Sequence, residues 1–305
     1  ALHVLITGGP GLIGRAVAAE LVGGGHRVTV LSRRPGDAAQ EGLPAGVQMA
    51  RWDGRSAEGW AELADGADAI VNLAGASIGA GRWSAAQKEV IRRSRLEAGQ
   101  AVTAAVQRAE HKPRVVVQAS GVGYYGPRGD EVVTEATPPG DDFLARVAVE
   151  WERSTAGLAE LGVRHVVIRT GMVLSAAGGS LPRLVMPFRL FAGGPMGSGR
   201  QWYAWIHIAD EAAAIRFLIE HESAEGPFNL TSPQPVTNRE FAAVLGRVMR
   251  RPAFFPTPAF ALRAALGEMA NLVLTGQRVV PERLQALGFA FRFPTLEAAL
   301  RDLLR

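Results

Sequence analysis

The chain has 305 residues, 48% hydrophobic and 20% charged, which is the balance of a globular protein with a substantial buried core. The absence of cysteine excludes disulfides, thiolate nucleophiles and cysteine-ligated metals, and we predict no metal site. No run approaches the roughly 18 apolar residues of a membrane-spanning helix. The net charge is +4, but the arginines are scattered and only Lys88 and Lys112 are lysines.

This charge distribution differs from the clustered basic tract of a nucleic-acid-binding protein. We therefore expect no nucleic-acid partner. Because no apolar run is long enough to span a bilayer, we also expect no membrane partner. The first residues, ALHVLITGG, read as an immediate strand without the basic region and cleavage site of a signal peptide. A cytoplasmic location is the simplest expectation.

The N-terminal half alternates β-rich runs with helical patterns. Strands are predicted at residues 2–7, 27–31, 47–50, 69–75, 114–120 and 164–170. Helices are predicted from about residue 11 to 21, over 85–109 and from residue 141. Strands that alternate with helices indicate an α/β fold with a parallel sheet covered on both faces. Right-handed crossovers then give a doubly wound arrangement.

Glycine and proline become frequent after residue 171, which predicts loops around a short helix. Later patterns predict a strand and helix over 205–220, a strand at 226–232, and helices over 238–249, 258–269 and 295–304. We therefore expect a first domain over residues 1–170, to which the chain returns at about 205–232. The rest of 171–305 forms a smaller, partly interleaved C-terminal α/β lobe.

A glycine-rich loop, TGGPGLIG, lies between the first predicted strand and the first helix. Dinucleotide sites use such glycines for a tight turn, for close approach to the pyrophosphate and for helix packing. The helix N-terminus then presents free N–H groups to the phosphates. The alternative is a glycine-rich turn without a ligand, but the strand–turn–helix context favours a Rossmann dinucleotide site. We predict cofactor contacts from Gly8, Gly9, Gly11, Leu12, Ile13 and Gly14.

The end of the second strand indicates which cofactor is bound. Ser32, Arg33 and Arg34 stand where NAD enzymes usually place an acidic residue. Guanidinium and hydroxyl groups bind a 2′-phosphate that a carboxylate would repel, so we predict NADP(H) in preference to NAD(H). A solvated basic turn is the alternative. Further contacts are predicted at Asp53, Leu73, Ala74 and Gly75, although Asp53 is equally compatible with a turn.

Together with ASGVGYYG at residues 119–126, these features resemble the extended short-chain dehydrogenase/reductase superfamily. The segments NLAGASI, RWSAAQKEVIRRSR, GDDF, GSGRQWYAWIHIAD, GPFNLTSP and GEMA are similar to its atypical branch of epimerase-family proteins of unknown substrate. The resemblance covers essentially the whole chain. It implies a Rossmann domain and an NAD(P) cofactor, but no established reaction.

Ordinary members of the superfamily use a Tyr-x-x-x-Lys pair, assisted by serine and often asparagine, to move a proton. By this resemblance Phe143 and Val147 occupy the tyrosine and lysine positions, and neither can transfer a proton. Ser120 resembles the upstream serine and is expected beside both substrate and cofactor. Arg95 matches the usual asparagine, where it would bind an anionic group of the substrate; a solvated helix face is the alternative.

Three residues are candidates for the missing proton donor. Tyr124 and Tyr125 follow the strand-end serine and would lie at the C-terminal edge of the sheet, where ligands bind; buried, space-filling tyrosines are the alternative. His207 titrates near neutrality, although its segment is expected to serve a structural role. The predicted catalytic set is Ser120, Tyr124, Tyr125 and Arg95.

Three functions are compatible with this pattern. The first is an NADP(H)-dependent oxidoreductase acting on a small carbonyl or hydroxyl substrate with an anionic group. The second is a nucleotide-sugar epimerase or dehydratase with displaced catalytic residues. The third is a non-catalytic NADPH-binding sensor that presents its C-terminal lobe to a partner. The sequence leaves the oligomeric state open.

Overall fold

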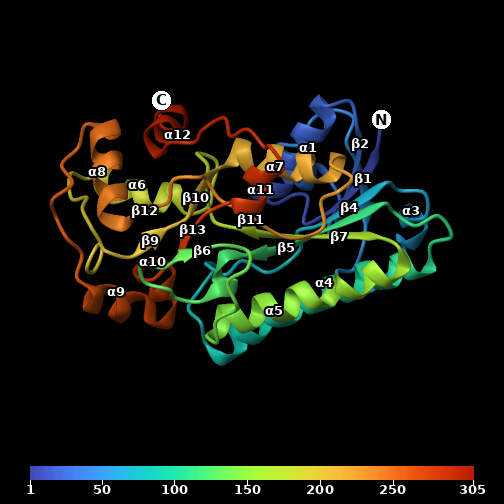
Figure 1. Ribbon diagram of the computed structural model, residues 1–305, viewed down its shortest axis with the longest axis horizontal. Helices are drawn as coiled ribbons and strands as arrows, with labels where there is room; N and C mark the ends of the chain where they lie inside the picture. The colour runs from blue at the N-terminus through green and yellow to red at the C-terminus, as the bar shows by residue number, and fades with distance from the viewer.

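The computed structural model describes residues 1–305, with the side chain of Ala38 excepted. Its centre is a seven-stranded parallel sheet in the order β11-β7-β5-β4-β1-β2-β3 (Figure 1). The strands are β1 (His3–Thr7), β2 (Arg27–Ser32), β3 (Gln48–Arg51), β4 (Ala69–Asn72), β5 (Val115–Gly121), β7 (Arg164–Thr170) and β11 (Gly226–Leu230). The strand order reverses between β1 and β4, so the predicted doubly wound fold is confirmed.

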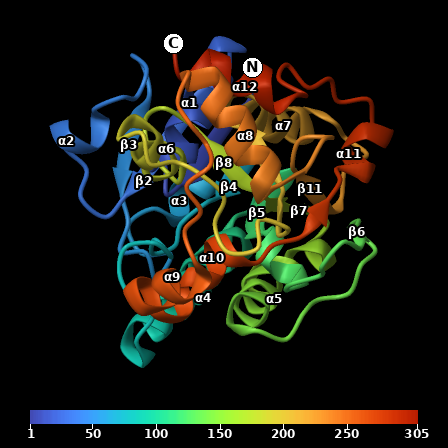
Figure 2. The same cartoon turned by 90° about the vertical axis from the view of Figure 1, so that its left-hand side faces the viewer.

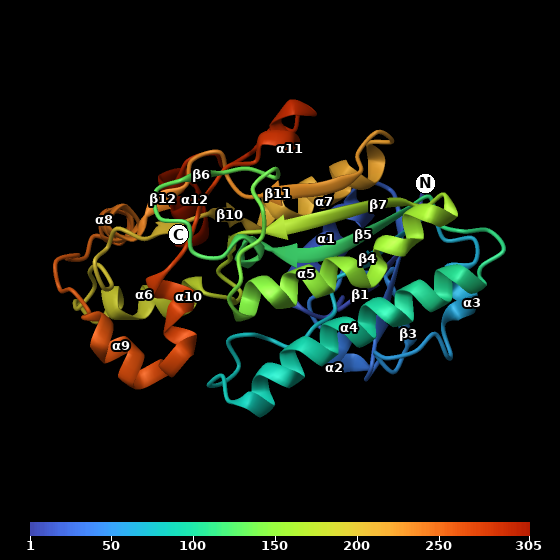
Figure 3. The same ribbon diagram turned by 60° about the horizontal axis from the view of Figure 1, so that its bottom comes forward.

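Helices cover both faces of this sheet (Figures 1 and 3). One face carries α1 (Leu12–Gly23) and α7 (Ile208–Glu220), and the other carries α4 (Ala85–Arg108) and α5 (Phe143–Ala156). Successive β1 residues alternate between the two cores: Val4 packs with α1 and α7, whereas Leu5 packs with α4. The short helices of this half are α2 (Asp37–Gln40), α3 (Ala61–Ala64), η1 (Val122–Tyr125) and η2 (Gly157–Leu161).

A smaller lobe with its own core lies at the carboxyl ends of the strands. This lobe faces the viewer in Figure 2. Its helices are α6 (Leu181–Arg189), α8 (Asn238–Met249), α9 (Ala259–Leu266), η3 (Gly267–Ala270), α10 (Asn271–Leu274) and α12 (Leu296–Leu303). Its short strands are β8 (Met172–Leu174), which pairs with β10 (Trp205–His207), and β9 (Trp202–Tyr203), which pairs with β12 (Val236–Thr237).

The two parts of the chain interleave. β13 (Arg278–Val279) pairs with β6 (Val132–Val133), and α11 (Glu282–Ala286) packs on β11. The helix predicted over 258–269 is divided into α9 and η3 by Gly267, whose φ of 62° ends α9. Among the described residues, no helix is both long and apolar enough to cross a bilayer.

Candidate functional site

The glycine-rich loop lies at the point where the strand order reverses. Gly8 has a φ of 66°, and a Cβ there would stand 2.9 Å from the carbonyl carbon of Leu73. A Cβ on Gly9 would overlap the side chain of Val30, and one on Gly14 would stand 2.5 Å from the Cα of Gly9. Bare backbone is therefore required where the loop passes β2 and β4. Gly11 caps α1 without a side-chain hydrogen bond, so the first amides of the helix are free for an anion.

A buried hydrogen-bond chain holds the end of β4 beside this loop. The Thr7 hydroxyl donates to Asn72 Oδ1 at 2.6 Å, and Asn72 Nδ2 donates to Gln118 Oε1 at 2.9 Å. Thr7 Oγ1 also accepts from the amides of Leu73 and Ala74, at 3.1 and 3.2 Å. These bonds end β4 at Asn72, earlier than predicted, and place the predicted contacts Leu73 and Ala74 next to the glycines.

The end of β2 presents two exposed arginines, Arg33 and Arg34. The hydroxyl of the buried Ser32 accepts from the Arg34 amide at 3.2 Å and so shapes the turn between them. Asp53 closes the neighbouring turn, because its Oδ1 accepts from the amides of Arg55 and Ser56 and its Oδ2 from the Ser56 hydroxyl. The bond from the Ser56 hydroxyl is the main reason that the pKa of Asp53 is lowered. This geometry supports the turn interpretation of Asp53.

The C-terminal lobe reaches the glycine loop through the segment between β8 and α6. Positions 178 and 179 lie against Leu12, since a Cβ on Gly179 would be 3.4 Å from Leu12 Cδ2. Arg183 of α6 donates to the Gly79 carbonyl at 3.3 Å. The first loop of the lobe therefore packs against the start of α1, and α6 contacts the segment that follows β4.

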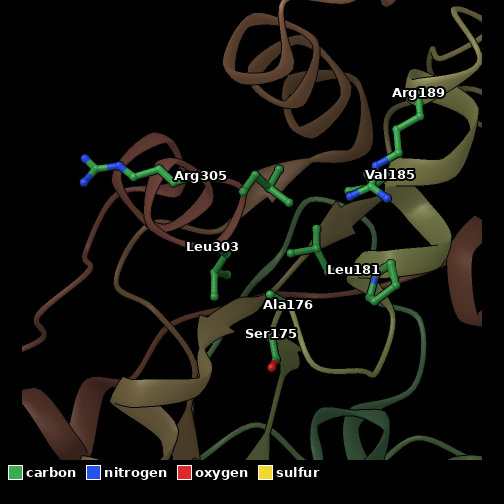
Figure 4. A pocket seen from close by; sticks show the side chains of 9 residues that line it. Ser175, Ala176, Leu181, Val185, Arg189, Leu303 and Arg305 are labelled. Carbon is green, nitrogen blue, oxygen red and sulfur yellow. The ribbon is translucent and has the colours of Figure 1, made fainter.

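A separate small pocket of about 210 Å³ lies between α6 and the end of the chain (Figure 4). Its lining is Ser175, Ala176, Leu181, Pro182, Val185, Arg189, Leu303, Leu304 and Arg305. Drug-sized ligands usually occupy roughly 300–1,000 Å³, and no predicted site residue lines this space. We therefore assign it no part in cofactor binding.

The face of α5 that would carry the tyrosine and lysine is apolar and covered. Phe143 packs edge-on against Trp83 with ring centroids 5.3 Å apart, and Lys88 Nζ lies 5.2 Å from the Phe143 centroid. Val147 is buried one turn further along. Lys88 also forms an ion pair with Glu268 of η3, which joins the C-terminal lobe to the start of α4. Sequence reasoning missed Lys88, although the scarcity of lysine was a signal.

Ser120 faces a buried ion pair. Its hydroxyl donates to Glu152 Oε2 at 2.6 Å. The same carboxylate accepts hydrogen bonds from Arg169 Nε and Nη2, each at 2.9 Å. Although burial acts in the opposite direction, the hydrogen bonds from Arg169 to Glu152 raise the pKa of Arg169. The Ser120 proton is thus committed to a carboxylate, which leaves only the oxygen lone pairs for a substrate.

The two tyrosines after β5 differ sharply. Tyr125 is fully buried, donates to Asn229 Oδ1 at 2.6 Å and accepts from Arg169 Nη1 at 3.1 Å. Burial raises the pKa of Tyr125 to about 12, and both hydrogen bonds of its hydroxyl are made to groups inside the protein. Tyr124 is partly exposed, and the Arg169 guanidinium lies 3.6 Å from its ring centroid. In the described part of the chain, no side chain or carbonyl bonds its hydroxyl.

Arg95 is only 9% exposed, so the alternative of a solvated helix face is wrong. Its Nη1 donates to the carbonyls of Ala76 and Ile91, at 2.9 and 3.0 Å, and its guanidinium stacks 4.7 Å from the Trp151 ring. Burial lowers the pKa of Arg95 to about 10. A Cβ on Gly75 would be 3.0 Å from Arg95 Cγ, so this cation clamps the segment that follows β4.

His207 serves the structural role that was expected for its segment. Its Nδ1 accepts from the Ala209 amide at 2.9 Å and so caps α7, which assigns the proton to Nε2. Nε2 then donates to Asp302 Oδ2 at 2.9 Å, and the ring stacks on Phe293 with centroids 4.0 Å apart. His207 therefore links α7 to α12.

A doubly wound sheet with a glycine loop at its switch point defines a dinucleotide-binding protein of the Rossmann type. Residues 4–231 match the NAD dependent epimerase/dehydratase family, and residues 257–303 match a domain of unknown function, DUF1731. The chain belongs to the NAD dependent epimerase/dehydratase family, which confirms the resemblance seen in its motifs.

The relatives are similar over their full length. The chain is 39% identical to an epimerase family protein of Staphylococcus epidermidis over 303 residues, 99% of this chain and 98% of that protein. It is 37% identical to one of Bacillus subtilis over 304 residues, with the same shares covered. The structure of a human epimerase family protein with NADPH shares 36% identity and a TM-score of 0.89, over 99% of each chain. UDP-glucose 4-epimerase of Thermus thermophilus, at 19% identity over 99% of this chain and 97% of its own with a TM-score of 0.76, shares the fold alone.

Proposed function

We propose that the protein binds NADP(H) in preference to NAD(H) across the glycine loop. The support is the pair of exposed arginines after β2, together with the NADPH in the similar human structure. The residues present fit such a cofactor, because Gly8, Gly9 and Gly14 leave no room for a Cβ where the loop packs on its neighbours, and the first α1 amides are free for the phosphates. The proposed contacts are the predicted residues Gly8, Gly9, Gly11, Leu12, Ile13, Gly14, Ser32, Arg33, Arg34, Leu73, Ala74, Gly75 and Ser120. Asp53 is no longer among them, because its carboxylate closes a turn.

The proposed reaction is hydride transfer with a small carbonyl or hydroxyl substrate, in the cytoplasm. The nicotinamide cofactor would supply or accept the hydride. Tyr124 is the proton donor to the substrate oxygen. The observation that carries this assignment is that no side chain or carbonyl of the described chain bonds its hydroxyl, while its ring is held against the Arg169 guanidinium. Ser120, with its proton held by Glu152, orients the substrate oxygen only through its lone pairs.

Arg95 is proposed to anchor an anionic group of the substrate. It is a nearly buried cation whose described hydrogen bonds engage Nη1 only, with backbone carbonyls. A carboxylate or phosphate on the substrate would complete its coordination through Nη2 and Nε.

The experiment is transfer of deuterium from C4-deuterated NADPH to a panel of small keto acids and aldehydes. We expect wild-type protein to transfer the label, and Tyr124→Phe to lower the rate at least about a hundredfold, within the range for general acid catalysis. Tyr125→Phe is the comparison, since it loses the same hydroxyl from a buried position. Unchanged transfer by Tyr124→Phe, with NADPH affinity retained, removes Tyr124 from the mechanism.

A non-catalytic NADPH sensor is the second candidate. It is favoured by the covered face of α5, where Trp83 and Lys88 lie on Phe143. Under this alternative NADPH still binds, but no substrate in the panel receives label. An epimerase with displaced catalytic residues would instead retain oxidised cofactor through purification.

A further inference from the structure

The outer surface of the C-terminal lobe carries an unusual concentration of exposed apolar side chains. In the described part of the chain nine large apolar side chains are exposed, and six of them come from two segments of this lobe. We call these six the aromatic patch: Met186, Leu190, Phe191, Phe254, Phe255 and Phe260. Phe254 and Phe260 are 71% and 76% exposed, so most of each ring meets solvent. Isolated exposed apolar residues are normal, but a contiguous group marks an interaction surface.

The two segments that form the aromatic patch lie side by side. The Phe255 amide donates to the Gly193 carbonyl at 3.1 Å, and Met196 bridges to Thr257. Arg251 stacks 4.3 Å from the Phe191 ring. In Figure 2 the chain between α8 and α9 crosses the face of the lobe that is turned toward the viewer. These contacts place the segments that carry Phe191 and Phe255 side by side, and α9 with Phe260 follows directly along the chain.

Phe191 is held outward at a cost to the backbone. Its φ is 61°, a left-handed conformation that bulky residues rarely adopt. It ends α6 at a position where glycine would be unstrained. The ring is 57% exposed, so burial within this chain does not offset the strain.

Both segments lie in acid-free parts of the sequence. Aspartate and glutamate are absent between Glu160 and Asp210, and again between Glu240 and Glu268. The arginines next to the aromatic patch are Arg189, Arg250, Arg251 and Arg263. Within the described residues none of these four has an ion-pair partner, whereas Arg247 on α8 pairs with Glu297 at 2.7 Å. The apolar tips thus stand among unneutralised positive charges.

We propose that the aromatic patch docks on an anionic phospholipid surface. Phenylalanine and leucine tips enter the boundary between headgroups and acyl chains, while the arginines meet the lipid phosphates. This differs from the expectation of no membrane partner, which considered only spanning segments. The proposal does not depend on the reaction proposed above.

The charge pattern separates this occupant from others. A two-fold contact between copies would place the patch on itself and bring arginines together without carboxylates from these segments. Single-stranded nucleic acid would stack on the phenylalanines, but Met186 and Leu190 offer bases no ring to stack on. A bilayer can bind the aromatic side chains and the aliphatic Met186 and Leu190 in its apolar layer, and the arginines at its phosphates.

The test is cosedimentation of the full chain with vesicles of phosphatidylcholine alone or mixed with phosphatidylglycerol. We expect binding to the mixed vesicles, little to the neutral ones, and release by salt. The double variant Phe254→Ser/Phe260→Ser should bind at least about tenfold more weakly, from the apolar burial it loses. Leu161→Ser removes a leucine that is 42% exposed on the Rossmann domain and is the matched control.

A second variant, Arg189→Glu/Arg263→Glu, should abolish the preference for phosphatidylglycerol. Unchanged NADPH affinity reports that each variant is folded. Absence of binding to the mixed vesicles overturns the proposal, as does equal binding by Phe254→Ser/Phe260→Ser. Binding of single-stranded RNA, or a dimer sensitive to the same substitutions, in place of lipid binding would also overturn it.

Discussion

Two regions at the carboxyl edge of the sheet are built in different ways: the proposed cofactor side, at β1 and β4, and the proposed proton-transfer side, at β5, β7 and α5. At β1 and β4, backbone and small residues form the site: glycines with no room for a Cβ and free amides at the start of α1. At β5 and α5, side chains form it, and the groups present are a buried Arg169–Glu152 pair and the apolar Phe143 and Val147. The glycine loop thus has the backbone geometry typical of a dinucleotide site, whereas the end of β5 and the start of α5 lack the usual tyrosine and lysine.

The largest expected effect comes from breaking the ion pair on the proton-transfer side. Glu152→Ala leaves the Arg169 guanidinium buried without its carboxylate, which costs about 3–5 kcal/mol. Urea unfolding measures this loss. Glu89→Ala is the control, because Glu89 pairs with Arg92 and Arg93 at the surface and is worth no more than about 1 kcal/mol. Equal losses in the two variants would show that the buried pair is not special.

The cofactor side should respond to a single methyl group. Gly9→Ala places a Cβ into the Val30 side chain and pushes the loop away from the phosphates. We expect NADPH affinity to fall at least about a hundredfold, or about 2.7 kcal/mol. Gly23→Ala adds the same atom where nothing lies within 4 Å and should leave affinity unchanged. Calorimetric titration of both variants checks this, and retained affinity in Gly9→Ala would contradict the cradle.

Glu211 is a buried acid on α7, and it should make the stability of the protein depend on pH. Burial raises the pKa of Glu211 from its usual 4.5 to about 8, and the Thr170 hydroxyl donates to it at 2.6 Å. Between these values the folded state retains a proton that the unfolded state has lost. Stability contributed by the neutral acid is therefore full below pH 4.5 and lost as the pH rises to 8.

The loss should be on the order of a few kcal/mol, and Glu211→Gln should remove it. Chemical unfolding of both proteins between pH 5 and 8, a range set by these pKa values, measures the slope. Identical slopes for the two proteins would show that Glu211 ionises normally in the fold.

The smallest expected effect is on the preference for NADPH over NADH. Arg33→Ala/Arg34→Ala removes the two guanidinium groups proposed to meet the 2′-phosphate. We expect NADPH to lose about tenfold in affinity, or about 1.4 kcal/mol, with NADH unchanged. Competition between the two cofactors measures the ratio. A parallel loss for NADH would mean that the arginines act on the fold and not on the phosphate.

The sequence predicted the fold class, the family and the position of the glycine loop, because each depends on local spacing. The groups on the proton-transfer side could not be predicted in the same way. Ser120 and Arg169 become neighbours only through the register of β5 against β7, and Glu152 reaches them from α5. Arg95 was singled out by position, but its burial depends on how Gly75 and Trp151 pack around it.

The covered face of α5 shows the same limit. Phe143 and Val147 were recognised as unable to move a proton, yet nothing local indicated that Trp83 and Lys88 would cover Phe143. The contact of Lys88 with Glu268 joins α4 to η3 and needs the whole lobe to be in place.

The most direct test of the central claim is a calorimetric titration of the wild-type chain with NADPH and with NADH. We expect one NADPH to bind per chain, at least about tenfold more tightly than NADH. Equal affinity for the two cofactors, or tighter binding of NADH, would contradict it.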